Sequence, residues 1–284
     1  MIRRRLPWAV LAGLVLAQIC YPLTAGATRA GLTVATVLLG WLLSVGHALL
    51  TRGTRAAFAL VAVATGGGFA IEALGVATGF PFGGYDYSGE LGPKLAGVPL
   101  IIPLAWTWMA WPAWLTAVRL TGRAGPGGDR PAPGWVDRLG RVTLAAVGLA
   151  AWDLFLDPQM VAEGYWVWRD GTPALPGLPG VPASNYLGWL LFAVLLMSAL
   201  RPLAGPAADR ADRRDAPMFA LYLWTYASSV LAHAVFLRLP ASALWGAAGM
   251  AVAAVPLAAA LLRARRAGSP APEPAARPGV DAPA

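Results

Sequence analysis

Eight long apolar stretches dominate this sequence and restrict the folds that it can adopt. They are Leu6–Thr24, Ala30–Leu50, Ala56–Gly79, Pro99–Leu120, Val142–Met160, Tyr186–Leu200, Met218–Leu237 and Ala241–Leu262. A helix of about 20 apolar residues crosses the hydrocarbon core of a bilayer and satisfies its backbone groups internally. The sequence therefore predicts an all-α, polytopic membrane protein with about eight transmembrane helices.

The charged residues support this interpretation and orient the chain. They make up only 13% of the 284 residues, whereas an average soluble domain has about 25%. Of the 22 lysines and arginines, 18 lie on the side of the predicted helices that also holds both ends of the chain. Because positive residues concentrate on the cytoplasmic side, we predict a multi-pass protein of the cell membrane with cytoplasmic N- and C-termini. This topology accounts for the net charge of +8, so no nucleic-acid partner is expected.

The chain is expected to form a single integral-membrane domain over residues 1–266, with a motif-rich core at residues 72–189. Residues 267–284 form a Pro/Ala-rich tail that we predict to be disordered. The inner connections 121–140 and 204–216 have the composition of plain polar linkers. We expect the first apolar stretch to be retained as a helix, although the three arginines before it are also compatible with a cleavable signal peptide.

Two of the outer connections differ from simple linkers because they are dense in glycine, proline and aromatic residues. They contain the segments Thr78–Tyr87, Leu91–Pro99, Asp157–Trp168 and Gly180–Trp189. Glycine and proline fix special backbone angles. We therefore predict that these outer loops are ordered.

The same two connections resemble each other. The sequence Gly97-Val98-Pro99 is followed by Trp106, and Gly180-Val181-Pro182 is followed by Trp189 at the same offset. Each motif follows an aromatic cluster and, before that, an acidic residue within an apolar stretch. This pattern predicts a parallel repeat whose acids face one another across a pocket. A chance match in a composition rich in Gly, Pro and Trp is the alternative.

The acids of this pattern are Glu72 and Asp153, and a third acid, Asp157, follows Asp153. A carboxylate at mid-membrane costs roughly 2.5–3.5 kcal/mol on insertion scales, so such residues are functional candidates. Asp153 and Asp157 are one helical turn apart and share a helix face. We expect at least one of the three acids to be protonated at neutral pH. Hydrogen bonding between helices and a proton or cation relay are the alternatives to catalysis.

The remaining chemistry-bearing residues are few. Cys20 is the single cysteine, which excludes an intramolecular disulfide framework. His47 is expected near the cytoplasmic interface, and His233 lies level with the acids, where it could orient a carboxyl group or simply pack. No metal-ligand spacing is present, so we predict no metal site.

These motifs are similar to those of the bacterial and archaeal carotenoid biosynthesis proteins that act as carotenoid hydratases, including bisanhydrobacterioruberin hydratases. The resemblance rests on Glu72, Thr78–Tyr87, Leu91–Trp106, Ala151–Pro158 and Gly180–Trp189. It implies an enzyme that adds water to the terminal double bond of an acyclic or monocyclic carotenoid in the membrane lipid, giving a tertiary alcohol. It also implies a hydro-lyase type of reaction without a redox cofactor or a metal.

The chemistry of that reaction suggests roles for individual residues. Protonation of an alkene requires a positioned acid in a dry site, and aromatic faces stabilise the resulting cation. We predict Asp153 as the proton donor, tuned by Asp157, with Glu72 orienting the water or sharing the donor role. The predicted substrate-binding residues are Tyr85, Asp86, Tyr87, Trp106, Trp152, Trp166 and Asn185. Among these, Tyr85, Asp86 and Asn185 are the groups expected to hold the water.

Three other functions fit the same features. A carotenoid cyclase starts with the same protonation but excludes water. A lipid or cation transporter would use the predicted repeat and the buried acids. A carotenoid-binding scaffold would serve other enzymes of the carotenoid pathway as partners. The sequence leaves open which carotenoid is used, whether one or both ends react, the side of water entry and the oligomeric state.

Overall fold

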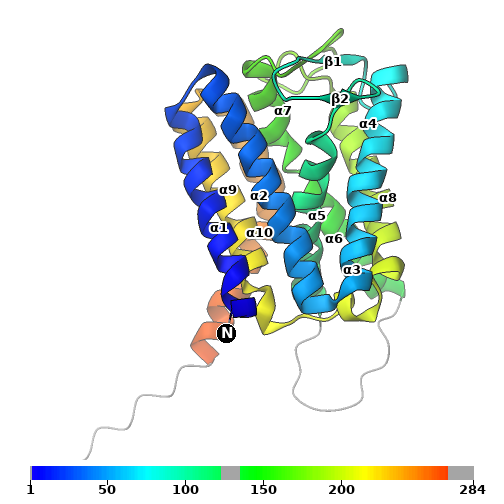
Figure 1. Ribbon diagram of the computed structural model, residues 1–284, viewed down its shortest axis with the longest axis vertical. Helices are drawn as coiled ribbons and strands as arrows, with labels where there is room; N and C mark the ends of the chain where they lie inside the picture. The colour runs from blue at the N-terminus through cyan, green and yellow to red at the C-terminus, as the bar shows by residue number, and fades with distance from the viewer. Residues whose placement is uncertain (1, 123–134, 268–284) are drawn as a thin grey trace, which may run out of the picture.

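The computed structural model describes residues 2–122 and 135–267, and within them the chain is a bundle of helices (Figure 1). The α-helices are α1 (Ile2–Cys20), α2 (Gly26–Arg52), α3 (Thr54–Leu60), α4 (Gly67–Thr78), α5 (Ile102–Thr121), α6 (Trp135–Ala150), α7 (Asp153–Ala162), α8 (Ala183–Ala204), α9 (Ala216–Leu231) and α10 (Pro240–Ala267). Shorter helical turns are η1 (Tyr21–Leu23), η2 (Val61–Gly66), η3 (Pro206–Asp209), η4 (Arg213–Asp215) and η5 (Ala232–Phe236). The strands are β1 (Tyr85–Tyr87), β2 (Lys94–Leu95), β3 (Val98–Pro99) and β4 (Trp166–Trp168). The predicted all-α polytopic class is confirmed.

Seven helical segments of the described chain are long and apolar enough to cross a membrane. They correspond to seven of the eight predicted stretches, and the eighth, residues 99–120, is α5. Tryptophan, threonine and proline make α5 less apolar than the others, yet every residue from Ala105 to Val118 is buried. A helix that is buried on all sides packs in the centre of a bundle, so neighbouring helices rather than lipid surround α5 (Figure 1).

The first helix begins and the last helix ends at the same end of the bundle, and the strands lie at the opposite end (Figure 1). This arrangement is what an even number of membrane passes produces. The predicted disordered tail lies outside the described residues, apart from Ala267 at the end of α10.

Three of the membrane-length segments are irregular. The passage from α3 to α4 includes the π-helical turn η2, and α9 continues into the π-helical turn η5. Between α6 and α7, Ala151 and Trp152 form a turn that places Asp153 in the first turn of α7. Interruptions of this kind occur frequently at functional sites, and here two of them directly precede the helices that carry the intramembrane acids.

The outer loops are ordered, as predicted. Strand β1 pairs antiparallel with β4, with Tyr85 opposite Trp168 and Tyr87 opposite Trp166. In the repeated Gly-Val-Pro motifs, Gly97 and Gly180 adopt φ angles of 80° and 85°. An L side chain is strained at such angles, which explains why glycine occupies the same place in both motifs.

The inner connection 204–216 is more structured than the plain linker predicted from its composition. Asp212 and Asp215 form a capping box around η4, and Arg52 at the end of α2 donates hydrogen bonds to both carboxylate oxygens of Asp215, at 2.7 and 2.8 Å. His47 is bonded through Nε2 to the carbonyl oxygen of Arg214, at 3.0 Å. These tertiary partners lie far away in the sequence, so local composition does not reveal them. Most of the other predicted linker, 123–134, lies outside the described residues, whereas residues 135–140 begin α6.

Close packing of α2 against α5 depends on a glycine. A Cβ atom at Gly40 would lie only 2.3–2.5 Å from ring atoms of Trp108, which is far inside van der Waals contact. Gly46 on the same helix has open space where its Cβ would be.

We expect Gly40→Ala to destabilise the protein by about 1–3 kcal/mol because the added methyl overpacks the α2–α5 contact. Gly46→Ala is the matched control, and it should be neutral or stabilising by up to about 1 kcal/mol through helix propensity. Thermal unfolding of both purified variants in detergent measures the difference. Equal melting temperatures for the two variants would contradict the described packing.

Candidate active site

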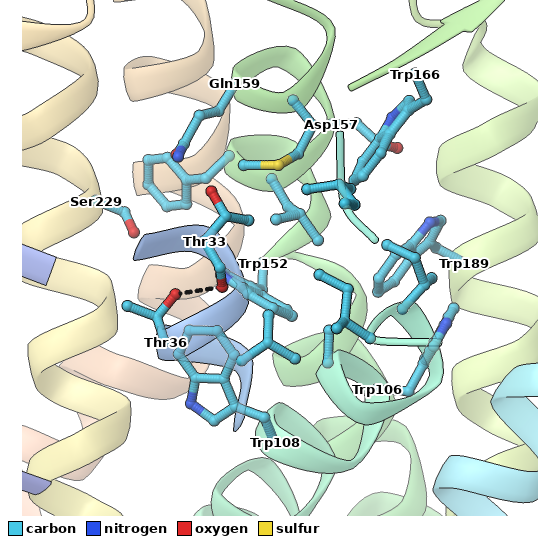
Figure 2. Close-up of a pocket in the computed structure, with 18 of the residues that line it drawn as sticks. Thr33, Thr36, Trp106, Trp108, Trp152, Asp157, Gln159, Trp166, Trp189 and Ser229 are labelled. Atoms are coloured by element: carbon cyan, nitrogen blue, oxygen red, sulfur yellow. Dashed lines mark hydrogen bonds between the residues drawn. The ribbon is translucent and has the colours of Figure 1, made fainter. Parts of the chain in front are cut away.

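Most of the predicted site residues meet around one cavity of about 130 Å³ (Figure 2), whose lining includes residues of strands β1 and β4. Eight of the ten predicted residues line it: Glu72, Tyr85, Tyr87, Trp106, Trp152, Asp157, Trp166 and Asn185. They come from α4, β1, α5, the α6–α7 turn, α7, β4 and α8. Segments that are more than a hundred residues apart in sequence therefore form a single site.

Glu72 lies in a cage of neutral hydrogen-bond donors. Its Oε2 accepts hydrogen bonds from the hydroxyls of Tyr85 and Tyr87, at 2.6 and 2.8 Å. Its Oε1 accepts one from Nε1 of Trp106, at 3.0 Å. Burial raises the pKa of both tyrosines, and the nearby Glu72 raises it further, so both hydroxyls remain donors. Three donors and no acceptor suit an ionised carboxylate.

Asp153 and Asp157 share a different partner. Nδ2 of Asn185 donates to Oδ2 of Asp153, at 2.9 Å, and also to Oδ2 of Asp157. Trp166 Nε1 donates to the remaining oxygen of Asp157, at 3.1 Å, whereas Oδ1 of Asp153 is buried without a partner in the described chain. Neither aspartate forms an ion pair with a basic residue among the described residues.

The two repeat motifs meet in the structure, but the prediction that their acids Glu72 and Asp153 face one another across a pocket is wrong for Asp153, which does not line the cavity. In the first half, strand β1 and helix α5 supply the donors to Glu72, and in the second half β4 and α8 supply the donors to the aspartates. Trp106 and Trp189, which occupy equivalent motif positions, stack with ring centroids 3.8 Å apart and an interplanar angle of 18°. The site therefore consists of two similar halves that meet at this tryptophan pair.

Two predicted residues do not reach the cavity. Asp153 is fully buried beside it but does not line it. Asp86 points away, because side chains alternate along β1; it is exposed and makes two hydrogen bonds with Arg169, both 2.9 Å long. These bonds hold the pKa of Asp86 below its ordinary value. Asp86 thus connects the two loops instead of lining the site.

The structure adds residues that the sequence did not single out as site residues. Trp108, Trp168 and Trp189 extend the aromatic walls. Trp168 and Trp189 lie in the outer segments rich in aromatic residues, which was a usable signal. A second group, Thr33, Thr36, Gln159, Ser228 and Ser229, comes from α2, α7 and α9. These are single polar residues in apolar helices, and no local motif marks them. His233 contacts Gln159 and Ser242, at 3.1 and 2.9 Å, and is not hydrogen-bonded to the acids.

Fold and site together define a polytopic membrane protein in which buried acids and aromatic side chains enclose a cavity. The chain belongs to the carotenoid biosynthesis protein family, which it matches over residues 32–256. It is similar to a bisanhydrobacterioruberin hydratase of Haloarcula japonica, with 41% identity over 146 residues. That match covers 50% of this chain and 44% of the relative, so the chain aligns with less than half of that protein. No solved structure matches the chain.

The Glu72 cage makes a prediction about stability. Trp106→Phe and Trp189→Phe remove the same atoms from the stacked pair, but only Trp106 donates to Glu72. We expect Trp106→Phe to cost about 1–3 kcal/mol more, because it leaves a buried carboxylate oxygen without its donor. Unfolding curves of the two variants in the same detergent measure this, and an equal loss would argue against the cage.

Proposed function

We propose that this protein hydrates the terminal double bond of an acyclic carotenoid end group and forms a tertiary alcohol. The observation that carries the proposal is the pair of buried aspartates, which has no basic partner among the described residues and contributes Asp157 to an aromatic cavity in a carotenoid biosynthesis family protein. Such a pair can hold a proton in a dry environment, which protonation of an alkene requires. The hydratase named among its relatives supports the same reaction.

The acid in this proposal is the aspartate pair. Two carboxylates that accept hydrogen bonds from the same amide group repel each other when both are ionised, and sharing one proton removes this repulsion. Asp157 lines the cavity, whereas Asp153 is fully buried and does not line it. We therefore assign proton donation to Asp157, and we assign the negative charge of the singly protonated pair to Asp153. This reverses the order expected from the sequence, in which Asp153 was the donor, while keeping the same pair.

The tertiary cation that follows needs stabilisation without capture. An aromatic face stabilises a desolvated cation by about 2 kcal/mol or more. Trp106, Trp152 and Trp166 line the cavity, and we assign this role to them. Water then attacks the cation and forms the C–O bond. The proton that the bound water releases balances the one given by Asp157, and we assign its acceptance to an ionised Glu72, which also lines the cavity.

The proposed reaction is of the hydro-lyase type and uses neither a redox cofactor nor a metal. Addition of water to an alkene transfers a proton and an oxygen nucleophile and involves no net oxidation. Its substrates are an acyclic or monocyclic carotenoid and water, with the carotenoid supplied from the membrane lipid.

Production in a bacterium that accumulates lycopene or γ-carotene tests this function. Mass spectrometry should show carotenoids heavier by one or two waters, with the polyene absorption unchanged because the terminal bond is not conjugated. An isomer of unchanged mass would indicate a cyclase instead. Unchanged pigments would contradict both enzymatic functions and favour transport or scaffolding.

Variants of the acids test the assigned roles. Asp157→Asn, Asp153→Asn and Glu72→Gln should each lower product formation by roughly 100-fold or more, the usual contribution of a positioned acid or base. Asp86→Asn is the matched control, because Asp86 lies outside the cavity, and it should retain most of the activity. Immunoblots of membrane fractions check that all four variants are inserted. Full activity of Asp157→Asn would contradict its role as donor.

We also propose that both termini face the cytoplasm and that the protein resides in the cell membrane, as the arginine distribution indicates. In a Cys20→Ala background, Gly89→Cys in the outer loop should react with a membrane-impermeant maleimide in intact spheroplasts. Ala267→Cys at the end of α10 should react only after lysis. The opposite pattern would invert the proposed topology.

A further inference from the structure

The cavity has two walls of different chemistry. We call the side that holds Glu72, Asp157 and their hydrogen-bond donors the acidic side. Figure 2 shows Thr33, Thr36 and Ser229 on one side, and Asp157, Trp166, Trp189 and Trp106 on the other, with Trp152 between them. We call the first side the neutral wall, and define it as Thr33, Thr36, Trp108, Ser228 and Ser229 from α2, α5 and α9. It carries hydroxyl and indole groups but no ionisable side chain.

The donors of the acidic side are already in use. Tyr85, Tyr87 and Trp106 donate to Glu72, and Trp166 and Asn185 donate to the aspartates. Two of the three groups that the sequence suggested for holding water, Tyr85 and Asn185, are therefore occupied. The third, Asp86, lies outside the cavity.

The neutral wall has hydrogen-bonding capacity to spare. Trp108 is only 4% exposed, and its Nε1 has no hydrogen-bond partner in the described chain. Thr33 and Thr36 donate their hydroxyl protons to carbonyl oxygens of their own helix, at 3.0 and 2.9 Å, so their oxygens can still accept. The hydroxyls of Ser228 and Ser229 can donate and accept. A buried water requires such a mixture of two to four polar partners.

We propose that the neutral wall binds the water molecule that attacks the carotenoid cation, on the side of the cavity opposite Asp157. This inference rests on the proposed hydration. Water is a much stronger base than an alkene, so a water beside the acid would accept its hydrogen bond and keep the acid from the alkene carbon. Placing the water on the far wall lets the π electrons of the alkene take the proton of Asp157 first. The water oxygen then forms the C–O bond, and its surplus proton passes across the cavity to Glu72 on the acidic side.

Deuterium labelling separates water delivery from protonation. In D2O, a cation that finds no water loses a proton again, and the recovered carotenoid carries deuterium at its end group. We expect Ser229→Ala, alone or with Thr36→Val, to lower hydration by about tenfold or more and to increase deuterium in the unhydrated carotenoid. The substrate is lycopene in membranes that contain the full-length protein.

Thr116→Val is the matched control. Thr116 is a buried threonine of α5 whose hydroxyl has no partner in the described chain, and it does not line the cavity. The control should hydrate like the wild type. A parallel fall of hydration and deuterium exchange in the Ser229 and Thr36 variants would overturn the inference and assign the neutral wall to carotenoid binding. Unchanged hydration would overturn it as well. A wild type that neither hydrates nor exchanges would contradict the proposed function itself, and the inference with it.

Discussion

A carboxylate within a membrane-spanning helix must be solvated by the protein, and Glu72 sets this requirement for the whole site. Its three hydrogen-bond donors are neutral and come from β1 and α5, so β1 must be held in place directly above α4. Pairing of β1 with β4 provides this support, and β4 in turn carries Trp166 to Asp157. The order of the outer loops thus follows from burying acids away from bulk water.

The two halves of the site use the same construction with different chemistry. Each half places an acid on one helix, a donor on the following strand and another donor on the next helix. The first half supplies three donors to one carboxylate, which favours its ionised form. The second half supplies one shared amide and one indole to two carboxyl groups, which favours a shared proton. These two arrangements are the ones that the proposed function assigns to a base and to an acid, and the stacked Trp106 and Trp189 lie where the halves join.

The apolar stretches, the intramembrane acids and the repeated Gly-Val-Pro motifs were sufficient to predict the fold class, the ordered loops and eight of the residues that line the cavity. Asp86 was misplaced because a three-residue strand gives no clear sign of which face points inward. Which of Asp153 and Asp157 lines the cavity depends on how α7 is rotated about its axis. Helical periodicity shows only that the two residues share a face. The neutral wall is formed by packing of α2 and α9 against α5, a long-range contact that no local pattern records.

The central position of α5 has a consequence for biosynthesis. Its tryptophans, threonines and proline suit a protein interior, but they reduce the free energy that this segment gains by partitioning into lipid alone. During translation, α5 would leave the aqueous channel of the insertion machinery efficiently only when neighbouring helices are present to cover it. Helix α6 follows it in the chain and packs along it. We therefore expect α5, the helix that carries Trp106, to partition into the membrane together with helices that pack against it, such as α2 and α6.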